Sequence, residues 1–320
     1  MIRDGSSEAI SSQSRKDCKD KKNLFKVNLN FPPKDLTDNR FELNLIFIRT
    51  RFVLTNTCMI SVTSIPYDNS SSFMCGPALA PDAIRAAFHS DSSNYFTESG
   101  VDLKNHSGWV DSGNISLAGT LPVNSIETGI DNLLSQYQKV FTLGGDHSIT
   151  YPVVKAFSKK YSELNILHLD AHADLYDNFE GDKYSHACPF ARIMEEGLAV
   201  RLVQAGIRTL STHQREQAKK FGVEIIEMKD WNAAIQFKFQ GPVYLSLDMD
   251  AIDPAFAPGV SHHEPGGFSS REVISIIQNL KGNLVGADLV EFNPTRDASG
   301  ITAMLAGKLF KELLGRLLIE

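Results

Sequence analysis

The sequence predicts an α/β fold: a single domain of three αβα layers, with a mainly parallel sheet between two layers of helices. From Met59 to the C-terminus, short apolar and β-branched runs alternate with segments of helical spacing, the pattern of parallel strands connected by helices. The chain has 320 residues, 42% of them hydrophobic, which is enough to bury a core of this kind. No internal repeat or low-complexity tract interrupts residues 59–320, so we expect one catalytic domain there.

Strands and helices can be assigned in order along this domain. Seven short runs predict the strands, and several of them end in Gly or Asp: ISVTSIPYD, KVFTLGGD, NILHLDAH, RLVQAGIR, VEIIEM, PVYLSLDMD and NLVGADLVEFN. Three longer segments place apolar residues three and four positions apart, which predicts amphipathic helices. Their apolar faces are Ile126, Ile130, Leu133 and Leu134, then Val273, Ile276, Ile277 and Leu280, and finally Leu305, Leu309, Leu313 and Leu317.

Residues 1–58 do not follow this pattern. They are rich in Ser, Lys, Asp and Asn, so we expect an N-terminal extension that is largely disordered or loosely packed, and dispensable. Its acidic residues, such as Asp4 and Glu8, are untypical of an organelle transit peptide. We therefore predict a cytoplasmic protein.

The charge and hydropathy of the chain argue against two classes of partner. The net charge is −6 and the isoelectric point is about 5.9, so there is no basic surplus for nucleic acid and we expect none to bind. No apolar run reaches the roughly 18–20 residues of a membrane-spanning helix, so we expect no membrane association.

Polar clusters follow four of the predicted strands. GGDHS follows KVFTL, DAHAD follows NILHL, DMDAIDP follows VYLSL, and EFNPTRD follows GADLV. Ligands of an open parallel sheet bind at the carboxyl ends of its strands, so we expect the active site at this edge. Side chains alternate in an extended segment, so Asp170, His172 and Asp174 can point the same way. Asp248 and Asp250 repeat the spacing of two.

With His147, these residues form a set of two histidines and four aspartates. Four adjacent carboxylates would raise one another's pKa values unless a cation neutralised them. One divalent ion rarely needs six protein ligands, whereas two ions that share two bridging aspartates would use all six. Mixed carboxylate and imidazole ligation suits Mn²⁺, with Ni²⁺, Co²⁺ or Zn²⁺ as alternatives. We therefore predict two Mn²⁺ ions per subunit.

Each of these residues, taken alone, also has a structural interpretation. An aspartate at a strand end often caps the next helix, and His147 could be a hydrogen-bonded core histidine. Three clusters at three strand ends favour a shared metal site instead. His168 precedes the cluster, and we interpret it as a buried, hydrogen-bonded residue that supports the site. No H-E-x-x-H motif, EF-hand loop, P-loop lysine or G-x-S-x-G elbow is present.

Four motifs resemble those of the arginase/agmatinase (ureohydrolase) family: GGDHSIT, LDAHADLYD, SLDMDAIDPAFAPG and VEFNPTRD. The resemblance extends from about Met59 to the C-terminus, and FEGDKYSHACPFARIME is similar to the plant-type branch of the family. It implies an arginase-like fold and a homo-oligomer, either a trimer or a hexamer. It also implies a binuclear-metal hydrolase that cleaves a guanidino compound to urea and an amine.

The resemblance further implies a role for each matching residue. One Mn²⁺ would be held by His147, Asp170, Asp174 and Asp248, and the other by Asp170, His172, Asp248 and Asp250, with Asp170 and Asp248 as bridges. His186 matches the family's loop histidine, a proton shuttle next to the substrate, and Glu291 matches the carboxylate that binds the guanidinium.

The chemistry expected of a guanidino substrate agrees with these roles. A guanidinium resists attack by neutral water, and a metal pair would supply hydroxide near neutral pH. Glu291 would hold the cationic group through paired charge-assisted hydrogen bonds. Asp174 would carry a proton to the leaving amine, and His186 would relay protons to solvent.

The sequence leaves the choice of substrate open. The segment DPAFAPG followed by EPGGFSSREV is more similar to agmatinases than to animal-type arginases, so we predict cleavage of agmatine to putrescine and urea. The alternatives are arginine, cleaved to ornithine and urea, and another small guanidino compound. A phosphoesterase and a non-catalytic metal-binding homologue are the more distant alternatives. His262 and His263 either line the mouth of the pocket or lie on a solvated loop.

Overall fold

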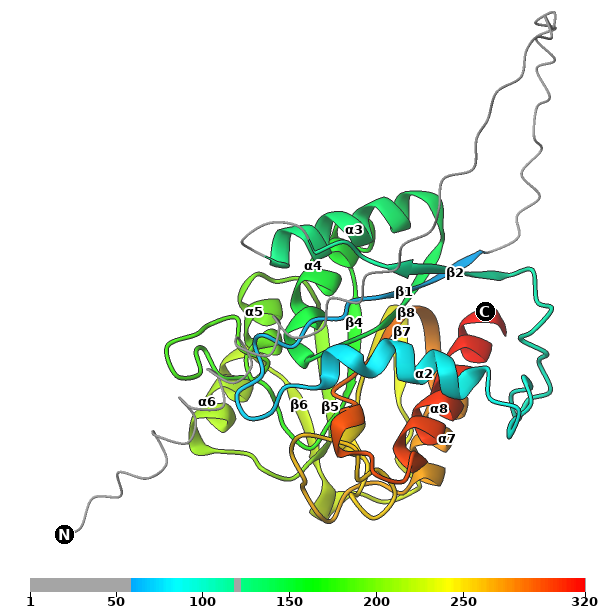
Figure 1. Cartoon of the computed structure of the whole chain (residues 1–320). Coiled ribbons are helices and arrows are strands. Elements are labelled where there is room, and N and C mark those ends of the chain that lie inside the picture. Colours follow the sequence, from blue (N-terminus) through cyan, green and yellow to red (C-terminus); the bar gives the residue numbers. More distant parts are fainter. Residues whose placement is uncertain (1–58, 118–121, 320) are drawn as a thin grey trace, which may run out of the picture.

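A computed structural model describes residues 59–117 and 122–319, which form one eight-stranded sheet between two layers of helices (Figure 1). The strand order is β2-β1-β3-β8-β7-β4-β5-β6, and all neighbouring strands are parallel. The predicted three-layer α/β class is confirmed. The predicted extension, residues 1–58, lies outside the described residues, so its looseness and the domain boundary at residue 59 stay predictions.

The chain alternates strands and helices. In order, the main elements are β1 (Ile60–Ser64), α2 (Ala80–Phe88), β2 (Trp109–Asn114), α3 (Pro122–Gln136), β3 (Lys139–Leu143), α4 (Thr150–Lys160), β4 (Asn165–Leu169), α5 (Pro189–Glu195), β5 (Arg201–Ile207), α6 (Thr212–Phe221), β6 (Glu224–Glu227), β7 (Lys238–Asp248), α7 (Ser270–Asn279), β8 (Lys281–Val290) and α8 (Ile301–Ile319). Short 3-10 helices follow four of the strands: η3 (His147–Ile149) after β3, η4 (Met228–Asp230) after β6, η5 (Met249–Ala251) after β7 and η6 (Pro294–Arg296) after β8.

All seven predicted strands are present, and β2 is an eighth strand that the pattern did not reveal. It forms one edge of the sheet and pairs with β1. Its sequence, WVDSGN, leaves every side chain half-buried or exposed. A strand of this kind lacks the continuous apolar run by which the other strands are recognised.

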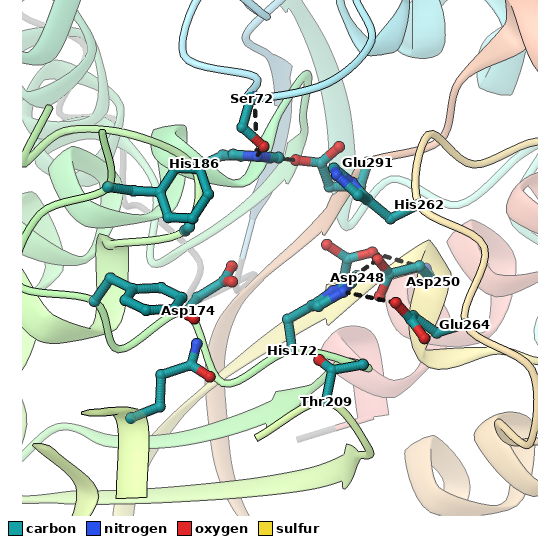
Figure 2. A pocket seen from close by; sticks show the side chains of 14 residues that line it. Ser72, His172, Asp174, His186, Thr209, Asp248, Asp250, His262, Glu264 and Glu291 are labelled. Atoms are coloured by element: carbon teal, nitrogen blue, oxygen red, sulfur yellow. Dashed lines mark hydrogen bonds and ion pairs between the residues drawn. The ribbon is translucent and has the colours of Figure 1, made fainter. Parts of the chain in front are cut away.

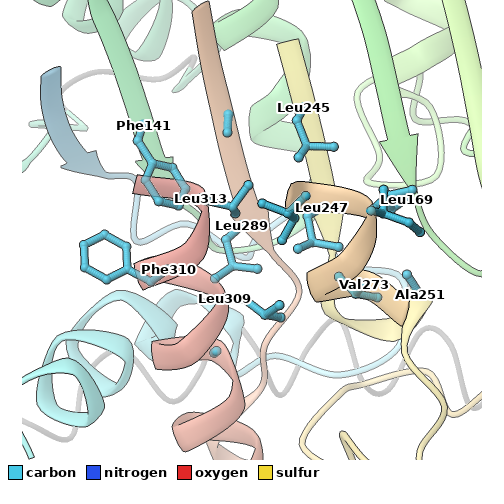
Figure 3. Close-up of a cluster of buried hydrophobic side chains, with 14 of the residues drawn as sticks. Phe141, Leu169, Leu245, Leu247, Ala251, Val273, Leu289, Leu309, Phe310 and Leu313 are labelled. Atoms are coloured by element: carbon cyan, nitrogen blue, oxygen red, sulfur yellow. The ribbon is translucent and has the colours of Figure 1, made fainter. Parts of the chain in front are cut away.

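The two helical layers bury two separate cores. Helices α3, α4, α5 and α6 cover one face of the sheet, and α2, α7 and α8 cover the other (Figure 1). In the second layer, apolar residues of α7 and α8 pack against the sheet: Val273, Leu309, Phe310 and Leu313 face Phe141, Leu245, Leu247 and Leu289 (Figure 3). The predicted apolar faces are buried except for Leu133 and Leu305, which are half-buried. Full burial of each leucine contributes roughly 1.5–3 kcal/mol.

The sheet order brings the four polar clusters together. Strands β3, β8, β7 and β4 are consecutive neighbours at the centre of the sheet. Because they run parallel, the segments that follow them leave the sheet at the same edge, the carboxyl edge that we predicted for the active site. Within the described residues, no helix combines the length and the apolar character needed to cross a bilayer.

Candidate metal centre

His147 begins the short helix after β3, and its ring is held by a buried network. Its Nε2 lies 3.0 Å from Ser246 Oγ, which donates in turn to Asp288 Oδ1 at 2.7 Å. Because the serine proton is given to Asp288, the His147 Nε2–H must be the donor to Ser246. In the neutral ring, Nδ1 therefore keeps its lone pair. Thr150 and Tyr244 also donate to Asp288, each at 2.8 Å, which fixes the whole network.

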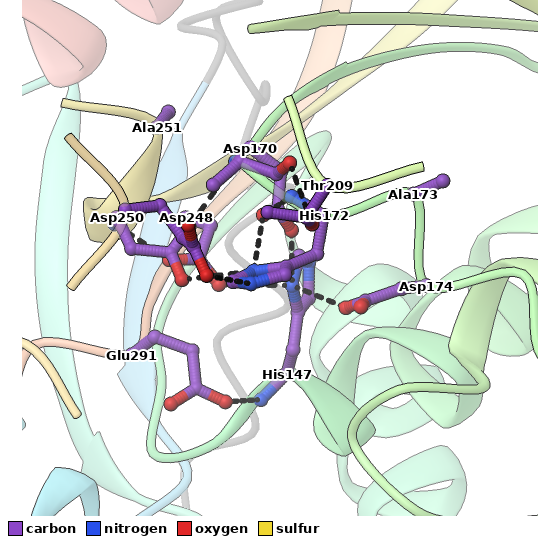
Figure 4. Close-up of polar contacts among 12 residues, drawn as sticks. His147, Asp170, His172, Ala173, Asp174, Thr209, Asp248, Asp250, Ala251 and Glu291 are labelled. Atoms are coloured by element: carbon purple, nitrogen blue, oxygen red, sulfur yellow. Dashed lines mark hydrogen bonds and ion pairs between the residues drawn. The ribbon is translucent and has the colours of Figure 1, made fainter. Parts of the chain in front are cut away.

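The Nδ1 edge of the His147 ring, which is not part of this network, faces three carboxylates. Its Nδ1 lies 3.1 Å from an oxygen of each of Asp170, Asp174 and Asp248 (Figure 4). The nitrogen is buried, yet it forms no hydrogen bond of good geometry within the described part of the chain. One imidazole nitrogen and three carboxylate oxygens thus converge at short range, and the nitrogen forms a well-aligned hydrogen bond with none of them, which is the arrangement of a cation site rather than of a hydrogen-bond network.

A second group lies beside the first. His172 Nδ1 is 3.1 Å from Asp250 Oδ2 and 3.4 Å from Asp170 Oδ1, and these three residues could hold a metal ion. Asp170 takes part in both groups, because its other oxygen, Oδ2, faces His147. The structure therefore brings together all six residues that the sequence suggested as ligands.

His168 also lies close enough to His147 and Asp170 to be considered as a ligand. Its ring is fully buried, with Nε2 2.8 Å from Asp170 Oδ2 and Nδ1 facing the Gln204 amide at 3.0 Å. Both of its nitrogens have hydrogen-bonding partners, so His168 orients the Asp170 carboxylate and does not act as a metal ligand itself. This matches the interpretation of His168 as a buried, hydrogen-bonded residue.

The local backbone differs from the extended segment that the spacing of two suggested. Strand β4 ends at Leu169, and Asp174 has a left-handed backbone with φ of 50°. Its carboxylate reaches His147 through this turn and not through strand alternation.

Asp248 also has the capping role that we considered as an alternative, because its Oδ1 accepts from Asp250 N at 2.7 Å. The capping bond uses only Oδ1 of Asp248, so Oδ2 still faces His147 in the metal cluster.

The electrostatics of the cluster call for positive charge. Burial raises the pKa of Asp248 well above its usual range, and the neighbouring Asp250 and Asp170 raise it further. Burial also disfavours ionisation of Asp170, but His168 and the other two histidines outweigh it and lower its pKa. Divalent cations would remove the repulsion between these carboxylates. The donor set therefore fits a pair of such ions.

Glu291 and His186 form a buried pair beside the metal cluster. Glu291 follows β8 with φ of 63°, and its Oε1 accepts from His147 N at 2.8 Å. His186 Nδ1 lies 2.8 Å from the same oxygen, while Ser72 N donates to His186 Nε2 at 3.1 Å. Because Nε2 accepts, Nδ1 carries the proton and donates to Glu291. Burial raises the pKa of Glu291 to about 7 and lowers that of His186.

The close approach of two loops makes this geometry possible. Gly145 precedes the metal cluster, and a Cβ at this position would collide with the Tyr67 backbone. Its carbonyl accepts from Glu291 N at 2.9 Å, while Asp146 N donates to Tyr67 O at 2.8 Å. Glycine is therefore required for the loop after β3 to hold both Glu291 and the loop after β1.

A pocket of about 270 Å³ opens onto both features (Figure 2). His186, Glu291, His172, Asp174, Asp248, Asp250 and His262 line it, whereas His263 does not. The remaining lining residues were missed by the sequence analysis: Ser72, Tyr176, Phe179, Ala187, Thr209, Gln214 and Glu264. Most of them come from loops with no periodic pattern, so only their nearness to a motif, as for Tyr176 after DAHAD, could have indicated them.

The fold and this site define a class of protein. A parallel α/β sheet carries carboxylate–imidazole clusters suited to two metal ions, and a buried carboxylate that suits a cationic substrate lies beside them. These are features of metal-dependent hydrolases that act on cationic small molecules.

Comparison with known proteins gives the family. The model of the arginase family matches residues 58–315. Arginase 1, mitochondrial, from Arabidopsis thaliana is 47% identical over 282 residues, which cover 80% of each chain. The chain therefore belongs to the arginase family, whose members are binuclear-metal enzymes that hydrolyse guanidino compounds. The ureohydrolase resemblance seen in the motifs is confirmed, and so is the prediction of an amidinohydrolase.

Solved structures agree with this assignment. Arginase from Medicago truncatula superposes with a TM-score of 0.77 at 43% identity, covering 82% of this chain and 88% of that one. The agmatine ureohydrolase of Thermoplasma volcanium has a TM-score of 0.69 at 31% identity, covering 82% and 90%. The fold is thus shared with both enzymes, and the plant arginase is the more similar of the two in sequence.

The prediction of a cytoplasmic protein is wrong. The Arabidopsis relative is named mitochondrial, and further plant relatives are named mitochondrial or chloroplastic/mitochondrial. The argument had rested on acidic residues in segment 1–58, which lies outside the described residues. A few acidic residues are a weak criterion against targeting, because targeting depends on the pattern of a whole segment.

Proposed function

We propose that this enzyme hydrolyses arginine to ornithine and urea. The observation that carries the proposal is the 47% identity with a plant arginase over 80% of the chain, against 31% for the agmatine ureohydrolase. The agmatine prediction had rested on the segment from Asp253 to Val273, which forms only part of the pocket wall. Arginine, formerly the alternative, is therefore the better-supported substrate.

The proposed roles of the site residues follow from their positions. The first metal ion would be held by His147, Asp170, Asp174 and Asp248, and the second by Asp170, His172, Asp248 and Asp250. We propose Mn²⁺ for both positions, because mixed carboxylate and imidazole ligands suit it. The two metal ions together would supply a hydroxide nucleophile near neutral pH.

The remaining steps belong to protein side chains. Glu291 binds the guanidinium, and its Oε1 is already oriented by His147 N and by His186 Nδ1 at 2.8 Å each. This orientation aims the guanidinium carbon at the cluster. Asp174 would accept the proton given up by the attacking hydroxide and pass it to the leaving amine. His186 would exchange other protons with solvent through Ser72, whose hydroxyl lies 2.7 Å from its Nε2.

A urea-release assay tests the choice of substrate. The protein is loaded with Mn²⁺ and given arginine, agmatine, guanidinobutyrate and guanidine at equal concentrations. We expect kcat/KM for arginine to exceed that for agmatine at least about tenfold, because a site that pairs with the polar α-groups discriminates against an analogue lacking one of them. Chelation should abolish turnover, and Mn²⁺ should restore it.

Other results of this assay would overturn the proposal. A higher kcat/KM for agmatine or guanidinobutyrate than for arginine would show that the enzyme is not an arginase but acts on that other guanidino substrate. Inactivity on all four compounds, with metal bound, would favour a non-catalytic homologue. Turnover of a phosphate ester would be unexpected, because Glu291 would repel an anionic substrate.

We also propose that the protein resides in an organelle, as its plant relatives are named to do. A fluorescent protein fused after residue 58 should localise with a mitochondrial or plastid marker. A diffuse cytosolic signal from both this fusion and the full-length fusion would contradict the proposal. The homo-oligomer expected from the family resemblance, a trimer or a hexamer, stays a prediction.

A further inference from the structure

Two adjacent histidines, His262 and His263, lie in the loop between η5 and α7 and differ in orientation. The His262 ring lines the pocket, whereas the exposed His263 turns away and its Nε2 lies 2.7 Å from the Pro258 carbonyl oxygen. Figure 2 shows His262 on the same wall of the pocket as Glu291. The pair therefore contains one residue that a ligand can reach and one that it cannot.

Three aromatic rings hold His262 in place. Its ring centroid is 5.5 Å from that of Phe73, 5.6 Å from that of His172 and 5.5 Å from that of His186. His172 belongs to the metal cluster, and His186 orients Glu291. His262 therefore lies between the two features that a guanidinium must contact together.

The ring nitrogens of His262 are available to a ligand. The other two imidazoles of the pocket are occupied, since His172 faces Asp250 and Asp170 and His186 bonds to Glu291 and Ser72. For His262, only the ring contacts above are found within residues 59–117 and 122–319, with no hydrogen bond or ion pair. A donor in the pocket could therefore reach a nitrogen of this ring without displacing a protein partner.

The charge of the substrate indicates what that donor is. A substituted guanidinium carries five N–H donors, and the carboxylate of Glu291 can accept two of them. The remaining N–H groups need further acceptors once water is excluded. A histidine nitrogen with a free lone pair can accept one of them.

We infer that His262 binds substrate directly by accepting a hydrogen bond from the guanidinium group, next to the contact made by Glu291. This inference rests on the proposed function, because it assumes a guanidino substrate. It extends that function by assigning His262 to the guanidinium head, which arginine and agmatine share, and not to the α-groups that distinguish them.

Three variants test the inference. His262→Ala removes the acceptor, His262→Gln restores an acceptor of similar reach, and His263→Ala is the matched control on the adjacent, outward-facing residue. Urea release is measured for arginine and agmatine. Binding of guanidinium chloride to the Mn²⁺-loaded protein is measured by calorimetry, and bound metal per subunit by elemental analysis.

We expect His262→Ala to lower kcat/KM roughly 10- to 100-fold for both substrates alike, the effect of losing one hydrogen bond to a charged group. Guanidinium affinity should fall with it, while the metal content stays at the wild-type value. His262→Gln should recover part of the loss. His263→Ala should match the wild type.

Each contrary result has a distinct meaning. Unchanged kinetics and guanidinium affinity in His262→Ala would overturn the inference and leave the proposed function standing. A loss restricted to arginine would overturn it as well, because the contact would then be with an α-group. If the wild type released urea from no compound, the proposed function would fail. Weaker guanidinium binding by His262→Ala would still support the inference in that case.

Discussion

Asp248→Ala should abolish turnover and reduce the bound metal. Asp248 Oδ2 lies 3.1 Å from His147 Nδ1, and Asp248 is proposed to bridge both ions. Loss of residues that merely orient a metal ligand costs about 10- to 100-fold in activity or affinity, so removal of a shared ligand should cost at least about 100-fold in kcat. The measurements are urea release and metal content after equilibration with Mn²⁺.

The companion variant Asp248→Asn separates metal binding from capping. The amide oxygen can still cap Asp250 N, a contact worth roughly 0.5–2 kcal/mol, yet the negative charge is lost. We expect Asp248→Asn to be as inactive as Asp248→Ala but to destabilise the fold less. Asp230→Ala is the control, because this exposed aspartate also follows a strand, β6, but lies far from the cluster in sheet order. Full activity of Asp248→Ala with two ions bound would refute the bridging role.

The same Asn variant should affect stability in opposite directions with and without metal. Burial, Asp250 and Asp170 raise the pKa of Asp248 in the folded protein. A raised carboxyl pKa means that the ionised form destabilises the metal-free fold once the pH exceeds the unfolded pKa. Near neutral pH, Asp248→Asn should therefore raise the Tm of chelator-treated protein and reduce the gain in Tm from Mn²⁺. A lower Tm in the chelated state would contradict this.

Glu291→Gln should leave the metal in place and remove most of the affinity for the guanidinium. Gln keeps an oxygen that accepts from His147 N, so the local fold should survive. Truncating one partner of a buried charge pair costs roughly 2–5 kcal/mol, which corresponds to a fall in kcat/KM of about 30-fold to several thousand-fold. Steady-state kinetics with arginine and metal analysis provide the measurement.

A glutamate outside the site provides the control for this change. Glu216 is exposed on α6, so Glu216→Gln should have the kinetics of the wild type. If Glu291→Gln retained wild-type kcat/KM, the carboxylate would have no role in substrate binding. If it lost metal together with activity, Glu291 would act through the cluster and not on the substrate.

Much of the architecture could be predicted because the relevant signals are local. Parallel strands buried on both faces are continuous apolar runs, and the helices between them have apolar faces at helical spacing. Strand β2 escaped prediction because an edge strand with polar, half-exposed residues carries neither signal. The ligand candidates were found because their motifs directly follow recognisable strands, as Asp170 follows Leu169.

The reason given for the ligand spacing was nevertheless inaccurate. Asp170 and Asp174 reach the cluster from a turn with a left-handed residue, and not from one face of a strand. The spacing indicated the correct group of residues, because short steps along a turn also keep side chains near one another. Its backbone geometry depends on the packing of neighbouring loops, including the contact of Gly145 with Tyr67.

The amino-acid pattern alone established the α/β class, the edge of the sheet that carries the chemistry and the identity of the candidate ligands, since all of these follow from short-range periodicity. The three-dimensional packing established which loops meet there. Ser72 comes from the loop after β1, yet it bonds to His186, 114 positions away in the chain. Of two adjacent histidines, packing against Phe73 and His186 turned His262 inward and left His263 outside. Contacts between distant segments leave no periodic trace in the sequence, because they depend on how completed elements pack together.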